Sequence, residues 1–302
     1  MTSAGDPEVS VIIATYNMGQ HVGQAITSVL AQQGHELEVI VVDDGSTDTT
    51  PRALEEFADE PRVRVLTQQN QGQPKAKNAG LRAARGRYIA FCDADDYWLP
   101  NKLDRQVPLL EKSAKVGVVY STIVRLDPDG SLHSRASRPM FKGRILDEMF
   151  VRNIVPFGTA IVRRECFDQV GGFDESIPMG IDWDLWLRIA ARWEFDVVAE
   201  PTYVYRIWEG QMSHNWRGRY DCALRIMERF LVTHQGLVSK EVIATAYADT
   251  YTNLAAAHLS DSGFRASLPY LRHALSHRLS FWPAWRLLLE GPRRGLRVLG
   301  RS

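Results

Sequence analysis

The sequence has few cysteines, no net charge and no long hydrophobic run. Its three cysteines are Cys92, Cys166 and Cys222. They are scattered and odd in number, which argues against a disulfide framework and favours a reducing compartment. No apolar run reaches the length of a bilayer, and the N-terminus lacks the basic and apolar regions of a signal peptide. We therefore expect a cytoplasmic protein, with at most a peripheral contact at the inner face of the membrane.

The zero net charge hides an asymmetry between the two parts of the chain. From Arg217 onward Lys and Arg outnumber Asp and Glu by 13 to 6, which leaves 23 basic and 30 acidic residues before that point. A basic tail suits an anionic partner such as membrane phospholipid, although solvated helix faces explain the same charges. We expect no nucleic-acid partner.

Strand patterns alternate with helix patterns in the first half of the sequence. Four β-branched or apolar runs, at 9–17, 37–46, 63–66 and 88–96, are separated by stretches with helical spacing. This alternation predicts an α/β fold, Rossmann-like, with a mainly parallel sheet and helices on both faces. From about residue 217 the pattern is helical throughout, over 222–233, 241–259, 264–277 and 282–299. We expect a catalytic domain over 1–216 and a helical region over 217–302.

The fourth strand ends in three carboxylates, Asp93, Asp95 and Asp96. Like charges gathered at the edge of a core repel one another and resist desolvation, so such a cluster favours a bound cation. Hard oxygen ligands suit Mg²⁺ or Mn²⁺, with substrate phosphates completing the shell. The alternative is a solvated acidic turn in which Asp96 or Asn101 caps the next helix.

The second strand also ends in acid, at Asp43 and Asp44. In parallel sheets ligands bind beyond the carboxyl ends of the strands, so both acidic ends should meet at one edge. Asp43 and Asp44 could accept hydrogen bonds from a nucleotide base or ribose, while the carboxylates after the fourth strand could hold a metal on a diphosphate. Taken alone, residues 43–48 also fit a tight turn with self-capping side chains. No glycine-rich dinucleotide motif or P-loop follows any predicted strand.

Three segments in order carry a resemblance to a known family. They are Val-Ser-Val-Ile-Ile-Ala-Thr-Tyr-Asn at 9–17, Val-Val-Asp-Asp-Gly-Ser-Thr-Asp at 41–48, and Asp-Ala-Asp-Asp at 93–96. Over roughly residues 8–210 the chain resembles family 2 glycosyltransferases with the GT-A fold. The resemblance implies an inverting, metal-dependent transfer of a sugar from a nucleotide sugar, by default a UDP sugar, to an acceptor hydroxyl on a glycan, glycolipid or polysaccharide.

The same resemblance implies roles for individual residues. Asp93 and Asp95 would form the Asp-x-Asp motif, with Asp95 on the metal and Asp93 near the ribose or the metal. Lys77 would be a basic residue of the donor site. The nucleotide base would be surrounded by three residues at strand ends, Thr15, Asp43 and Asp44.

A later segment supplies a candidate general base. From Asp182 the sequence reads as an amphipathic helix in which Asp184 pairs with Arg188 at i+4. Asp182 then reads either as the helix N-cap or as a base for the acceptor hydroxyl, and the two roles are compatible. The segment resembles the family's region around its catalytic Asp, which maps to Asp182. It departs from the family by having Ile181 where Glu is common.

Residues 201–214, after the candidate general base, read as a strand followed by a polar loop. In relatives the matching loop covers the diphosphate, which implies a phosphate contact for Arg206 and a metal-ligand role for His214. A solvent-exposed histidine is the commoner explanation for His214. A non-catalytic nucleotide-sugar-binding or scaffold protein is the alternative function, and Ile181 is the one feature that favours it. A sugar-1-phosphate nucleotidyltransferase is disfavoured because its glycine-rich N-terminal loop is missing.

Overall fold

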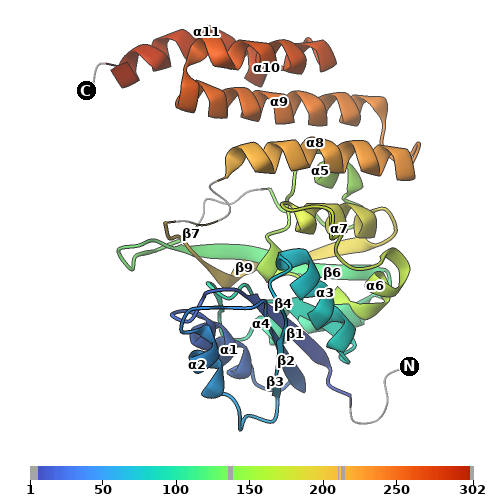
Figure 1. Cartoon of the computed structure of the whole chain (residues 1–302). Helices are drawn as coiled ribbons and strands as arrows, with labels where there is room; N and C mark the ends of the chain where they lie inside the picture. The colour runs from blue at the N-terminus through green and yellow to red at the C-terminus, as the bar shows by residue number, and fades with distance from the viewer. Residues whose placement is uncertain (1–5, 135–138, 210, 212–214, 300–302) are drawn as a thin grey trace. The chain divides into compact units, whose positions relative to one another are not determined.

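The computed structural model shown in Figure 1 describes residues 6–134, 139–209, 211 and 215–299, with only the backbone for 292–299. The chain divides into two compact units. The first unit comprises Met1–Ile145 and Ile154–Gln211, and the second comprises Leu146–Asn153 and Met212–Ser302. The second unit therefore includes a short segment from the middle of the chain that no sequence pattern set apart.

A parallel sheet forms the first half of the first unit. Strand β1 (Val9–Thr15) pairs in parallel with β2 (Leu37–Asp43) and with β4 (Tyr88–Phe91), and β2 pairs with β3 (Val63–Thr67). Nearly every residue of β1, β2 and β4 is buried, as expected for strands covered on both faces. The register sets Thr15 beside Asp43, so these two residues lie at the same carboxyl edge.

The second half of the sheet is mixed. The strand order is β3-β2-β1-β4-β8-β6-β9-β5, with β7 (Leu132–Ser134) paired to β6 (Val116–Leu126). Strand β8 (Ile161–Arg163) is antiparallel to both β4 and β6, whereas β9 (Glu194–Arg206) is parallel to β6. Strand β5 (Tyr97–Trp98), which directly follows the acidic turn, is antiparallel to β9. This pairing brings the end of β9 next to the acidic turn.

Helices cover both faces of the sheet, which confirms the predicted fold class. On one face α1 (Val22–Leu30), α2 (Thr50–Glu55) and α4 (Lys102–Lys112) share one apolar core with alternate residues of β1 and β2. On the other face α3 (Gln73–Ala83) approaches closely at Gly80, where a Cβ would lie 2.5 Å from Ile12. Glycine is favoured there because a Cβ would overlap the side chain of Ile12 on the sheet.

An aromatic cluster joins β4 to the later helices of the first unit. Phe157, in the short 3-10 helix η1 (Phe157–Thr159), lies 4.7 Å from Phe91 and 6.1 Å from Trp186 between ring centroids. Trp186 belongs to α7 (Ile181–Ala190) and is fully buried. The cluster also packs Phe173, in the loop between α6 (Arg164–Val170) and α7.

The start of α7 corrects one detail of the sequence interpretation. Helix α7 begins at Ile181 with Gly180 as its N-cap, at φ 77°, so the prediction that Asp182 caps the helix is wrong. Glycine adopts this left-handed conformation without a steric cost, whereas aspartate would do so less readily.

The second unit is helical, as the sequence predicts. Its helices are α5 (Leu146–Val151), α8 (Trp216–Thr233), α9 (Lys240–Ser262), α10 (Phe264–His277) and α11 (Trp282–Leu299). Between α9 and α10 the chain turns at Gly263, whose φ of 88° suits glycine. None of the helices in the described part of the chain is long and apolar enough to cross a membrane.

Candidate active site

The acidic turn lies at the carboxyl end of β4, where the sequence places the metal ligands. Asp93 keeps 28% of its side chain exposed, and its Oδ1 accepts a hydrogen bond from Lys77 Nζ at 2.8 Å. The Lys77 ammonium is itself buried and lies 3.6 Å from the centroid of the Phe157 ring. One cation therefore balances Asp93 from the side of α3 and is held in place by an aromatic face.

The end of β9 fixes the shape of this turn. The Tyr203 hydroxyl donates to Asp96 Oδ2 at 2.9 Å and accepts from the Asp93 backbone N–H at 3.1 Å. The Arg206 backbone N–H donates to Asp96 Oδ1 at 2.8 Å. Both oxygens of the buried Asp96 are thus used within the protein, so Asp96 holds the turn and leaves Asp93 and Asp95 to face the sheet edge.

The turn concentrates negative charge. Burial raises the pKa of the Asp96 carboxyl well above its usual value, and the charges of Asp95 and Asp93 raise it further, against the hydrogen bonds from Arg206 and Tyr203. A raised carboxyl pKa means that another negative charge is disfavoured at this place. A cation bound at Asp93 and Asp95 would relieve the same repulsion.

Asp95 is oriented by the segment that follows β9. The indole Nε1–H of Trp208 donates to Asp95 Oδ2 at 2.8 Å, and Arg206 Nε donates to the Asp95 carbonyl at 2.8 Å. The same guanidinium donates through Nη2 to Gln24 Oε1 on α1, at 2.6 Å. Both acceptors of the guanidinium are neutral, so these hydrogen bonds orient Arg206 without neutralising its charge, as a phosphate-binding arginine requires.

A second group of candidate residues lies at the ends of β1 and β2. The Thr15 hydroxyl is buried and has no hydrogen-bond partner among the described residues. A buried hydroxyl without a partner costs free energy, so this atom is a candidate for contact with a ligand. Asp43 is also buried and accepts the Ser46 backbone N–H at 3.0 Å, which is the self-capping turn that the sequence allowed.

Asp44 organises the loop before α3. Its Oδ1 accepts from Gln68 Nε2 at 2.7 Å and from the Gln71 N–H at 2.9 Å, while Oδ2 accepts from the Gly72 N–H at 2.8 Å. Both carboxylate oxygens are therefore used inside the protein. This geometry makes Asp44 a residue that shapes the edge of the site.

Contacts through the aromatic cluster connect α7 to the acidic turn. Lys77 binds Asp93 and rests on Phe157, and Phe157 contacts Trp186 of α7. Asp182 lies four residues before Trp186, so both residues occupy the same side of the helix. The candidate base thus lies in the first turn of α7, on the same side of the helix as Trp186.

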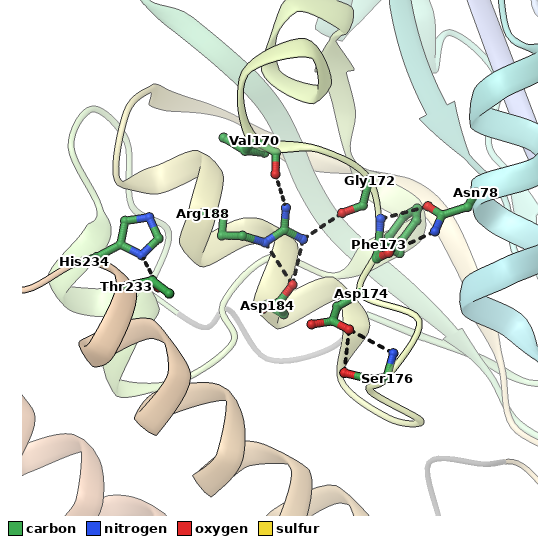
Figure 2. A network of polar contacts seen from close by, with 10 residues as sticks. All are labelled: Asn78, Val170, Gly172, Phe173, Asp174, Ser176, Asp184, Arg188, Thr233 and His234. Atoms are coloured by element: carbon green, nitrogen blue, oxygen red, sulfur yellow. Dashed lines mark hydrogen bonds and ion pairs between the residues drawn. The ribbon is translucent and has the colours of Figure 1, made fainter.

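Figure 2 shows how the start of α7 is held. Arg188 donates to Asp184 Oδ2 at 2.6 and 3.0 Å, which confirms the predicted i, i+4 pair. The same guanidinium also donates to the carbonyls of Val170 and Gly172, at 2.7 and 2.8 Å. One arginine therefore ties the loop after α6 to the first turns of α7.

Asn78 holds the other side of this loop and was not singled out from the sequence. Its side chain accepts the Phe173 N–H and donates to the Phe173 carbonyl, both at 2.9 Å, as Figure 2 shows. It also donates to Glu175 Oε1 at 2.9 Å. Because Asn78 follows Lys77 on α3, adjacent residues of one helix reach the acidic turn and the loop that leads to Asp182. The signal available in the sequence was an asparagine inside a predicted helix, a position that asparagine does not favour.

The carboxylates suit a metal ion that the substrate helps to hold. Among the described residues, no group of three or more His, Cys, Asp or Glu is placed to bind a metal. Asp93 and Asp95 still provide two hard oxygen ligands, and Mg²⁺ is usually bound by one or two carboxylates together with substrate phosphates. These residues fit such an ion. The third predicted ligand, His214, lies outside the described residues.

Two further residues of the site were missed because they are distant in sequence from the acids. Trp208 reaches Asp95 across 113 positions, and nothing local in the sequence indicates this contact. His21, the N-cap of α1, is close enough to the site that, besides burial, the charge of Arg206 lowers its pKa while Asp95 raises it. The polar start of α1 therefore borders the acidic turn.

The fold of the chain is similar to that of solved glycosyltransferase structures. TarS of S. aureus, residues 1–349 in complex with UDP-GlcNAc, has a TM-score of 0.68 at 18% identity, covering 95% of this chain and 92% of that one. The mannosyltransferase PcManGT from Pyrobaculum calidifontis, in complex with GDP-Man and Mn²⁺, has a TM-score of 0.65 at 22% identity, covering 97% and 81%. The chain thus has the GT-A fold, as expected.

The sequence comparison then gives the family. The profile described as Glycosyl transferase family 2 matches residues 10–171, and the chain belongs to this family. The succinoglycan biosynthesis protein ExoO of Rhizobium meliloti is 34% identical over 239 residues, which are 74% of this chain and 68% of ExoO. The chondroitin synthase of Escherichia coli is 33% identical over 186 residues, 61% of this chain and 26% of that protein. The chain thus spans about a quarter of the latter.

Proposed function

We propose that this protein is an inverting glycosyltransferase that moves a sugar from a nucleoside-diphosphate sugar to a hydroxyl of a glycan, glycolipid or polysaccharide acceptor. The observation that carries the proposal is the acidic turn at the carboxyl edge of the sheet, with Asp95 oriented by Trp208 and Asp93 balanced by Lys77. Membership of the glycosyltransferase family supports the same class of reaction.

The donor would lie along this edge. Thr15 and Asp43 would contact the nucleoside, and Asp44 shapes the adjacent loop. Arg206 and Lys77, which both contact the acidic turn, would bind the diphosphate. Asp93 and Asp95 would hold Mg²⁺ or Mn²⁺, which neutralises charge on the leaving diphosphate. The Mn²⁺ in the similar mannosyltransferase structure supports this assignment. We keep UDP as the default nucleotide.

Asp182 would take the proton from the acceptor hydroxyl as its oxygen attacks the anomeric carbon. The bond from that carbon to the diphosphate breaks on the opposite side, so the sugar is transferred with inversion. Ile181, the departure from the family pattern, is buried with 4% of its surface exposed. An apolar side chain is therefore compatible with its place at the start of α7.

Calorimetric titration with UDP, GDP and dTDP, in Mn²⁺ and again in EDTA, tests the donor site. We expect one nucleotide to bind in a metal-dependent manner and Asp95→Ala to abolish that dependence. Asp59→Ala is the matched control, since Asp59 is an exposed acid on the helical connection after β2. Absence of binding by any nucleotide with metal present would contradict the proposed donor site.

A second experiment separates transfer from binding. Asp182→Asn should keep metal-dependent nucleotide binding but lose transfer, because the amide cannot accept the acceptor's proton. If the wild-type protein binds the nucleotide sugar but transfers to no acceptor, the scaffold alternative gains support. If Asp182→Asn transfers at the wild-type rate, the assignment of the base is wrong.

A further inference from the structure

Helix α11 carries two apolar faces, of which one is used inside the second unit. Ala284 is fully buried in the small core formed with Ala255, Leu271 and Ala274, and Leu287 and Leu288 pack against it. Gly291 lies on the same side, where a Cβ would come 2.8 Å from Phe264. This face is the inward face of α11.

The opposite face presents large apolar side chains to the outside. Trp282 is 65% exposed and Leu289 is 63% exposed, and Leu279, just before the helix, is 71% exposed. At about 100° per residue, positions 282, 286 and 289 fall within roughly 60° of one another and opposite to Ala284 and Gly291. We call Trp282, Arg286 and Leu289 the outward face. A helix that is apolar on both sides is normally covered on both.

The sequence of this segment is strongly basic. From Arg278 to the last residue the sequence has six arginines and one acid, Glu290. Arg286, in the middle of the outward face, is exposed and pairs with Glu290 at 3.1 Å. Tryptophan and leucine beside arginine are typical of helices that lie in the interface of a bilayer, with the apolar groups among the acyl chains and the cations at the headgroups.

We propose that the outward face of α11 docks on an anionic lipid surface. The helix would lie in the plane of the interface, with Trp282 and Leu289 inserted and Arg286 at the lipid headgroups. A lipid surface explains both the exposed apolar side chains and the excess of arginine, since anionic headgroups attract each cation. The inference concerns the second unit alone and does not depend on the proposed transfer reaction.

Cosedimentation of the full chain with vesicles tests this surface. We expect binding to phosphatidylcholine vesicles that contain phosphatidylglycerol and little binding to phosphatidylcholine alone, with weaker binding at high salt. The double variant Trp282→Ser, Leu289→Ser should lose about tenfold or more in affinity, because two apolar side chains no longer enter the bilayer. Arg286→Glu should reduce the preference for the anionic lipid.

The chain offers a matched control in Val232→Ser, Leu237→Ser. These two side chains are 70% and 50% exposed in the same unit but away from α11, and their replacement should leave vesicle binding unchanged. Circular dichroism would verify that both double variants stay folded. Failure of the wild-type chain to bind anionic vesicles, or equal losses in both double variants, overturns the proposal. So does light scattering that shows a dimer dissociated by the α11 double variant, since the face would then join two copies.

Discussion

The contact between Trp208 and Asp95 allows a sharp test of how the candidate metal site is built. Trp208→Phe removes the Nε1–H that donates to Asp95 Oδ2 at 2.8 Å and keeps an aromatic ring at the end of β9. Hydrogen bonds to metal-binding side chains orient their ligands, and their loss typically weakens metal binding about 10-fold to 100-fold. Because Asp95 is also held through its carbonyl by Arg206, we expect the lower end, about 10-fold, or ~1.4 kcal/mol.

The assay is calorimetric titration of Mn²⁺ into the protein with a saturating amount of the nucleotide that binds. Trp285→Phe is the matched control, since the Trp285 Nε1–H makes a hydrogen bond of similar length, 2.7 Å, to the Leu279 carbonyl in the second unit. Both variants should lose a similar amount of stability in urea unfolding, about 1 kcal/mol. Wild-type affinity of Trp208→Phe for Mn²⁺, with nucleotide binding intact, would refute the role of Trp208 in orienting Asp95.

Three further predictions concern the framework of the site. Burial holds the pKa of Lys102 well below 10.5, so the unfolded chain binds a proton that the folded chain lacks, and the free energy of unfolding should rise with pH up to 10.5. Lys102→Met should flatten this rise in urea unfolding curves, and an unchanged pH dependence would contradict the role of Lys102. Asn78→Ala should cost about 2–3 kcal/mol through its lost buried hydrogen bonds, against less than about 0.5 kcal/mol for the exposed Asn253→Ala, measured in the same way. Gly80→Ala should destabilise the protein by about 1–3 kcal/mol because the new Cβ meets the Ile12 side chain, whereas Gly23→Ala should stabilise it because the new Cβ lies 3.9 Å from the Phe57 ring. Equal melting temperatures for the two variants would contradict this packing.

Local patterns in the sequence predicted those parts of the fold that depend on neighbours along the chain. The structure confirms that the four apolar runs are strands. β1, β2 and β4 are buried and apolar on both faces, whereas β3 is partly exposed at the edge of the sheet. The pair Asp184 and Arg188 is confirmed because i and i+4 residues meet on any helix. The N-cap at Asp182 was predicted wrongly because Gly180, with its left-handed backbone, starts the helix two residues earlier.

The sequence by itself determined the α/β fold class, the helical C-terminal part and the acidic strand ends, because periodicity and composition record which faces are buried. Only the tertiary structure decided how the acids are used. Both carboxylate oxygens of Asp96 and of Asp44 accept hydrogen bonds inside the protein, whereas Asp95 is oriented by Trp208, which is distant in the sequence. These contacts join residues that are 24 to 113 positions apart. No local pattern encodes them, since they arise from the order of strands in the sheet and from the pairing of β5 with β9.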